Sequence, residues 1–201
     1  MRVVVVARTR MHRGTICIGA LSDGGENLRL MTGNCEYHPT NCRYRVGQAW
    51  EVAVRACPDL QAPHLEDVAV LEARFLGMEN DLPAFILGRV TPWRGSIHVL
   101  FDGLIEFTTN GSGYISESTG LPRSSTGFWF PDHGLIFRAQ PRPAYYAGDG
   151  FRYLSYVGTA AAVPVIRAGT LVRVSLAKWW RPPDADPSFE YRCYAQLSGW
   201  Y

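Results

Sequence analysis

The chain of 201 residues almost lacks lysine, because Lys178 stands alone beside 19 arginines. Its net charge is only +2, from 20 basic and 18 acidic residues, which excludes a strong whole-chain attraction to polyanions. Arginine grips phosphate bidentately and stacks on flat rings, although a GC-rich coding sequence also replaces lysine by arginine. Any affinity for a polyanion must therefore come from a local patch of arginines.

Long apolar runs and a leader are also missing. No stretch approaches the roughly 18 to 20 apolar residues that span a bilayer, and no charged-then-apolar leader precedes the strand-like run at residues 2–8. The five cysteines are an odd number without the spacing of a disulfide framework. These absences predict a reducing, cytoplasmic protein that is not integral to a membrane.

Signatures of catalysis are scarce. The chain has no G-x-S-x-G, Walker A or G-x-G-x-x-G motif, so hydrolase, phosphate-loop and dinucleotide-binding classes lack their usual support. His64, Glu66 and Asp67 could supply a general acid or base, although a histidine beside a carboxylate is usually only a hydrogen-bonded pair. They are the catalytic candidates of an alternative hypothesis, a metal-assisted hydrolase or nuclease.

The corresponding metal candidates are Cys35, His38 and Cys42, a C-x2-H-x3-C cluster in a polar loop. Cys57 or His64 could add a fourth ligand, and these ligand types suit zinc. The spacing matches none of the paired-cysteine zinc knuckles. We therefore expect no cofactor, with zinc as the alternative.

Short strands account for most of the chain. In the first half, β-branched runs and alternating patterns predict five strands, at residues 2–8, 15–21, 27–31, 48–55 and 67–75. Helical spacing between Gly77 and Gly88, with Asn80 or Asp81 as N-cap and Pro83 in the first turn, predicts one short helix. Five strands in this order suit a small Greek-key barrel, of which the OB-fold is the commonest.

The second half offers further strands, at residues 97–101, 104–108, 135–139, 151–157, 161–166, 170–179 and 189–200. A segment rich in Gly and Ser, residues 108–132, interrupts them. It predicts an ordered connection between the halves, or a binding loop in which Arg123 faces a phosphate or a base. The predicted fold is all-β with low helix content: two tandem OB-like barrels packed together, at 1–77 and 95–201, with a connector at 78–94.

Arginines alternate with aromatic residues near one face of the first predicted barrel. The middle strands and adjoining loops of an OB-fold are where single strands lie, because rings accept any base and arginine neutralises the backbone. Aromatic residues also fill β cores, and arginines also solvate edges. The candidate nucleic-acid-binding residues are Arg8, Arg10, Arg13, Arg29, Tyr44 and Arg45, with Arg123 in the later loop.

Segments in three parts of the chain resemble the bacterial dual OB-domain family. They are VVVVARTRMHRGTICIGAL with Asn27-Leu-Arg-Leu30 near the start, Pro63-His-Leu-Glu-Asp-Val68, and TLVRVSLAKWW with YAQLSGWY at the end. The chain departs from the family where Met11 to Cys17 replaces a Lys-Gly-Gly-Arg-Cys type of turn, and where Leu28 replaces an aromatic residue. The resemblance implies a nucleic-acid-binding module on two tandem OB-folds. The matching positions are Arg8, Arg10, Cys17, Arg29, His64, Glu66 and Asp67.

The sequence and the resemblance together predict a binder of single-stranded DNA or RNA rather than an enzyme. We expect an accessory subunit of a bacterial nucleic-acid-processing or defence system, with nucleic acid and possible partner enzymes as its partners. Besides the hydrolase, the alternative is a protein-interaction subunit whose exposed aromatic residues dock a partner enzyme.

Overall fold

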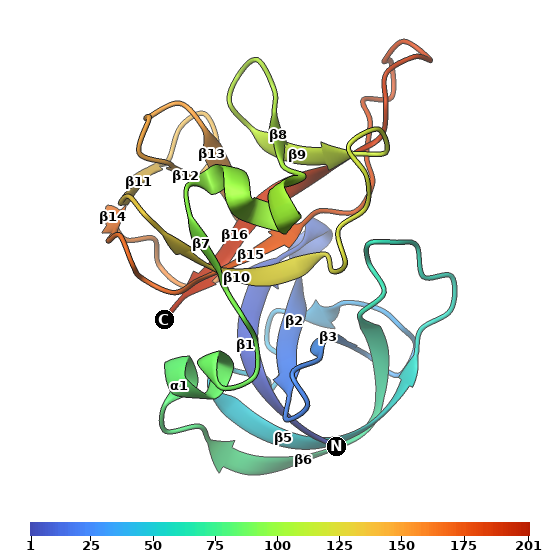
Figure 1. Cartoon of the computed structure of the whole chain (residues 1–201). Coiled ribbons are helices and arrows are strands. Elements are labelled where there is room, and N and C mark those ends of the chain that lie inside the picture. The colour runs from blue at the N-terminus through green and yellow to red at the C-terminus, as the bar shows by residue number, and fades with distance from the viewer. The chain divides into compact units, whose positions relative to one another are not determined.

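The computed structural model describes residues 1–201 (Figure 1). Strands hold 46% of the residues and helices 8%, which confirms the all-β class with low helix content. The chain divides into two compact units: residues 1–91 with 157–160 and 201, and residues 92–156 with 161–200. The division at Thr91 falls inside the expected connector, and each unit is described by itself.

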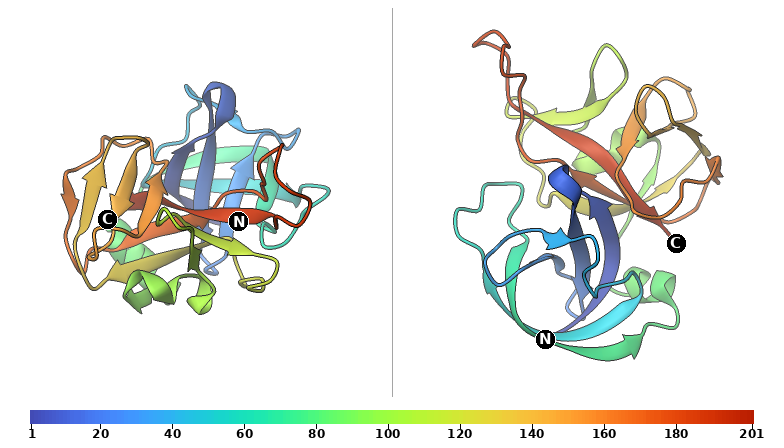
Figure 2. Two further views of the ribbon diagram at one scale, coloured as in Figure 1. Left: turned by 90° about the horizontal axis from the view of Figure 1, so that it is seen from above. Right: turned by 180° about the vertical axis from the view of Figure 1, so that it is seen from behind.

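The first unit is a closed barrel, whose curled strands Figure 2 shows from two sides. The ring order is β1-β2-β3-β6-β5-β1, and every pairing is antiparallel except that of β3 with β6. This is the Greek-key order of an OB-fold. Its elements are β1 (Arg2–Arg10), η1 (His12–Gly14), β2 (Thr15–Ser22), β3 (Asn27–Met31), β4 (His38–Pro39), β5 (Gln48–Ala56) and β6 (Asp67–Met78).

Strand β1 is the element that closes this ring. It pairs with β5 through residues 2–4 and with β2 through residues 3–10, and a bulge between Val5 and Ala7 bends it. Val3 and Val5 join the barrel core, while Val4 and Val6 on the opposite face are buried too. Burial of both faces explains why the sequence reads as a continuous β-branched run instead of an alternation.

The expected helix is present as α1 (Leu82–Leu87) and belongs to the first unit. The Asp81 carboxylate accepts a hydrogen bond from the Ala84 N–H at 2.9 Å, and Pro83 occupies the first turn. Phe85, a residue of this helix, is buried, and the Arg89 guanidinium lies 3.7 Å from the centre of its ring. The helical spacing and the cap signals in the sequence together located this helix.

The second unit repeats the barrel with a divided first strand. Strands β10 and β11 are separated only by residues 132–134; β10 pairs with β15, and β11 pairs with β12. The ring then runs β12-β13-β16-β15, with β13 and β16 parallel. The unit consists of β7 (Trp93–Gly95), η2 (Ile97–Gly103), β8 (Glu106–Phe107), β9 (Gly113–Ser116), β10 (Thr126–Pro131), β11 (Leu135–Arg138), β12 (Ala144–Tyr146), β13 (Tyr153–Tyr156), β14 (Val165–Ile166), β15 (Val172–Leu176) and β16 (Arg192–Trp200).

Two predictions for this unit were wrong. Residues 97–101 lie in the 3-10 element η2 and not in a strand. Residues 108–132 are not only a connection, because they contain β9 and most of β10, and Ile115 and Trp129 are buried in the core of the second unit. Short strands between glycines carry little periodicity, so the composition of the segment concealed them.

Close approach explains two of the glycines in this segment. A Cβ on Gly111, whose φ is +85°, would lie 2.3 Å from the Phe151 carbonyl oxygen. A Cβ on Gly127 would lie 2.3 Å from the ring of Trp93, on the neighbouring strand β7. These glycines allow chain segments to pack closely, which differs from supplying flexibility to a linker.

Candidate nucleic-acid interface

In the first barrel, Arg29 is not available to a phosphate. Only 7% of the residue is exposed, and its guanidinium donates to Asp67 at 2.5 Å and to Glu66 at 2.6 Å. Burial opposes its charge, yet nearby Cys17, Glu66 and Asp67 keep the Arg29 pKa above its ordinary value. The assignment of Arg29 to a binding surface is therefore corrected: it is a buried partner of two carboxylates.

The structure does bring together the alternative catalytic candidates His64, Glu66 and Asp67. Their side chains are buried, and His64 Nδ1 lies 4.0 Å from Glu66 Oε1. Both carboxylates are engaged by Arg29 where β3 meets β6. This cluster has no face open to a substrate, so the geometry gives the hydrolase hypothesis no support.

Tyr44 is also corrected. Only 3% of it is exposed, and it belongs to the core of the first barrel. Its ring meets the rings of His38 and Trp50 edge-on, at centroid distances of 5.2 and 5.0 Å. The arginines on either side of Tyr44 in the sequence suggested an exposed loop, but the tyrosine points inward.

Arg8 and Arg10 remain at the surface near the end of β1. Arg8 Nη2 donates to the Thr40 carbonyl at 3.0 Å, and Arg10 Nη2 donates to the Thr159 carbonyl at 3.4 Å. Each guanidinium retains further N–H groups for an anion. These two residues could therefore contact phosphate, although no aromatic platform in the structure is paired with them.

The other three candidate arginines occupy exposed loops. Arg45 turns back to donate to the carbonyls of Cys42 and Tyr44. Arg13 lies in η1 with a left-handed φ of +60°, and Arg123 lies between β9 and β10. They are surface cations distributed over both units.

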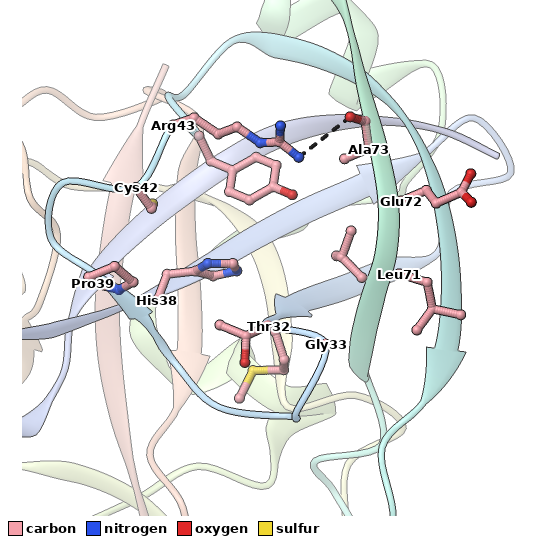
Figure 3. Close-up of a pocket in the computed structure, with 12 residues that line it drawn as sticks. Thr32, Gly33, His38, Pro39, Cys42, Arg43, Leu71, Glu72 and Ala73 are labelled. Carbon is pink, nitrogen blue, oxygen red and sulfur yellow. Dashed lines mark hydrogen bonds between the residues drawn. The ribbon is translucent and has the colours of Figure 1, made fainter.

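The alternative zinc cluster is corrected as well. Cys35 forms a disulfide with Cys57, so it is not a thiolate ligand, and the cysteines are not all reduced. His38 and Cys42 do line a common pocket, which Figure 3 shows. No group of three metal-ligating side chains is present.

The second barrel carries an aromatic and basic stack that the sequence analysis missed. Tyr146 of β12 faces Tyr153 of β13 across the strand pair, with ring centroids 4.9 Å apart. The Arg138 guanidinium lies 4.1 Å from the centre of the Tyr146 ring. Tyr145 and Leu154 form the next pair along these two strands, and both are in the core of the second unit. The Tyr146 and Tyr153 rings are therefore on the outward face of the second and third barrel strands, beside an exposed arginine.

The turn between β12 and β13 extends this surface. Asp149 accepts hydrogen bonds from the N–H groups of Phe151 and Arg152 and pairs with the Arg152 guanidinium at 2.5 Å. Burial alone would raise the Asp149 pKa, but these bonds hold it below its usual value. The ordered turn leaves Phe151 52% exposed.

A shallow pocket of about 540 Å³ adjoins the turn. The guanidinium of Arg152 lies 5.3 Å from the ring centre of Phe107, and His98 meets the same ring edge-on at 5.2 Å. Phe151 and Tyr114 also line this pocket. Rings and a cation are therefore available at the end of the hairpin as well as on its strands.

One sequence signal could have indicated this hairpin. Asp149-Gly150 is a turn dipeptide, and aromatic residues lie on both sides of it. Strand β12 is only three residues long and follows a proline-rich stretch, so it has too few positions to show an alternation.

Two barrels in one chain, each with the Greek-key strand order, define a tandem OB-fold protein. The sequence matches the family described as the dual OB-containing domain over residues 1–200. The chain therefore belongs to this family, as the resemblance in its sequence predicted. No curated protein and no solved structure was found to match it.

None of the helices is long and apolar enough to cross a membrane.

Proposed function

We propose that the protein binds single-stranded nucleic acid, DNA or RNA, on the outward face of β12 and β13. The observation that carries the proposal is the stack of Arg138, Tyr146 and Tyr153. In OB-folds the second and third strands are the usual platform for oligonucleotides. Bases stack on exposed rings while guanidinium groups neutralise the backbone, and this recognition tolerates any sequence.

The dispersed arginines have a secondary role in this proposal. Arg8, Arg10, Arg13, Arg45 and Arg123 supply weak phosphate contacts, and Arg152 supplies one at the hairpin turn. Since the net charge is only +2, affinity depends on the local stack and is modest at physiological salt. A cytoplasmic accessory subunit of a bacterial nucleic-acid-processing or defence system is the role that suits such a binder.

Fluorescence anisotropy with labelled oligothymidylate and oligouridylate at low salt tests the proposal. Tyr146→Ala and Tyr153→Ala should each weaken binding by about 1 to 3 kcal/mol, the cost of losing one stacked base. Phe75→Ala is the matched control, because Phe75 is an exposed aromatic residue on β6 of the first barrel. Absence of binding at low salt, or an equal loss in the control, would refute the proposal.

A protein-interaction role is the second candidate. Trp180 and Tyr191 are exposed in the long connection between β15 and β16, and Arg181 lies over the Tyr191 ring at 4.9 Å. Exposed aromatic residues with arginine are typical of protein interfaces. A single partner enzyme that co-purifies after nuclease treatment and is lost on Trp180→Ser would favour this role.

A further inference from the structure

The pocket in Figure 3 is a cavity of about 340 Å³ in the first barrel, between the loop after β3 and strand β6. Its volume is near the lower end of the range for small-molecule sites, roughly 300 to 1,000 Å³. Met31, Val70 and Pro39 contribute apolar walls, and Thr32 and Gly33 lie at one end. It is therefore a small, mostly apolar cavity that requires a compact ligand.

His38 supplies a buried acceptor in this cavity. The residue is 9% exposed, and its Nε2 atom is buried without a hydrogen-bond partner. Burial lowers the His38 pKa, while a hydrogen bond to the Leu30 backbone partly opposes this shift. A neutral imidazole that donates from one nitrogen presents a lone pair on the other. Figure 3 shows the ring pointing from the loop toward β6.

Arg43 supplies a flat group of donors. Its guanidinium carbon lies 4.8 Å from the Trp50 ring centre and 5.6 Å from that of Tyr44, which positions the side chain. It donates a long hydrogen bond, from Nη2 to the Ala73 carbonyl at 3.4 Å, drawn as the dashed line in Figure 3. A ligand acceptor can therefore replace or share this contact.

We propose that this pocket binds a single nucleobase, either of a free nucleoside or of an unstacked residue in a single strand. A nucleobase is flat and largely apolar on its faces, and its edge offers N–H donors for His38 beside acceptors for Arg43. A phosphate would meet only one cation and a neutral imidazole. If the base belongs to a single strand, the inference rests on the proposed function. If the base belongs to a free nucleoside, it does not, because a nucleoside needs no binding by the other barrel.

The direct test is an NMR titration of isotope-labelled protein with adenosine, guanosine, cytidine and uridine, with ribose 5-phosphate as the control for anion binding. At least one nucleoside should shift the amides of Thr32, Gly33 and Glu72, and move the His38 Nε2 resonance in the direction of an accepted hydrogen bond. Ribose 5-phosphate should leave them unchanged. The proposal is overturned if ribose 5-phosphate alone shifts these resonances, or if none of the four nucleosides shifts them.

Two variants test the assigned contacts. His38→Phe keeps a ring in the cavity but removes the acceptor, and Arg43→Gln keeps the surface polar but removes the cation. Each should weaken nucleoside binding about tenfold, as expected for one hydrogen bond to a buried group. Arg43→Gln alters an exposed residue and keeps the test decisive if His38→Phe does not fold. If a folded variant binds nucleosides with unchanged affinity, the replaced side chain does not contact the base, and that part of the proposal is overturned.

Oligonucleotides separate this inference from the proposed function. If the base comes from a strand, Arg43→Gln should weaken oligothymidylate binding but not binding of an abasic strand of the same length. If the base comes from a free nucleoside, oligonucleotide affinity should be unaffected while nucleoside binding is lost. Binding of oligonucleotides without any nucleoside shift overturns the pocket and leaves the Tyr146 surface standing. If the protein binds nucleosides but not oligonucleotides, the pocket stands and the proposed function at the Tyr146 surface is overturned.

Discussion

The two barrels share one strand order but differ on the outward face of their second and third strands. In the first barrel, Arg29 on β3 is buried against Glu66 and Asp67. In the second, Tyr146 and Tyr153 occupy the outward face of β12 and β13, with Arg138 over the first ring. The same topology therefore carries a closed ionic cluster in one unit and an aromatic platform in the other, which shows that fold alone does not locate a binding face.

The largest effect is expected from opening the ionic cluster of the first barrel. Arg29→Met leaves two buried carboxylates without their cation, which should cost about 3 to 5 kcal/mol of stability. Arg74→Met is the control, because Arg74 pairs with Glu51 at an exposed, solvent-screened site and its loss should cost far less. Urea unfolding measures both. Equal losses would mean that Arg29 is no more structural than a surface arginine.

The disulfide is expected to have the next largest effect. Cys35 and Cys57 close a loop with a sequence separation of 22 residues. Loop-closure entropy predicts that replacing both with serine costs about 3 kcal/mol. Cys42→Ser, in the same loop, should change stability little. Urea unfolding measures the difference, with a thiol count to verify that the parent protein is oxidised. Identical midpoints for the parent protein and the double serine variant would contradict the prediction.

A smaller effect on binding should distinguish Arg138 from other stacked arginines. Arg138→Ala should reduce the dependence of log affinity on log salt by about 0.7, as for one lost phosphate contact to a single strand. Arg94 is a matched control, since it is exposed and lies 4.3 Å from the Phe130 ring centre. Anisotropy titrations over a range of salt concentrations measure the slope. A comparable change in Arg94→Ala would remove the special role of the β12–β13 face.

The smallest effect is a pH dependence in the first barrel. The His38 pKa is lower in the folded chain than in the unfolded one because of burial, so the unfolded state binds more protons. Its contribution to stability is therefore complete above about pH 6.5 and declines as the pH falls below that value. Urea midpoints at several pH values, compared with those of His38→Phe, isolate it. In the variant, the urea midpoint should depend less steeply on pH. An unchanged pH dependence would show that His38 is not its source.

The strands of the first barrel were predictable because each is long enough to show its pattern. Residues 2–8, 15–21, 27–31, 48–55 and 67–75 all fall within observed strands. In the second unit, β12 has three residues and β14 has two, and η2 carries an apolar run that suits a strand equally well. Local periodicity disappears at such lengths, and only tertiary pairing defines the element.

The candidate site was less predictable than the fold. Tyr44 and Tyr146 both lie in stretches with arginines nearby, yet one ring fills a core and the other lies on an outward face. Composition does not reveal which way a tyrosine points when the strand register is unknown. The buried Arg29 shows the same limit, since its two carboxylate partners are 37 and 38 residues away in the sequence.

The loop at residues 32–47 is attached to the first barrel at points besides its two ends. Its β4 segment pairs with β2, and its Cys35 forms a disulfide with Cys57. The loop is not needed to close the barrel, because β3 pairs directly with β6 at three parallel residue pairs. Tyr44 fills part of the barrel core, but exposed positions of the loop such as Arg43 can be exchanged without opening the barrel. The walls and polar groups of the pocket lie partly on this loop, so its sequence can be varied by evolution or design to change ligand preference while the scaffold is retained.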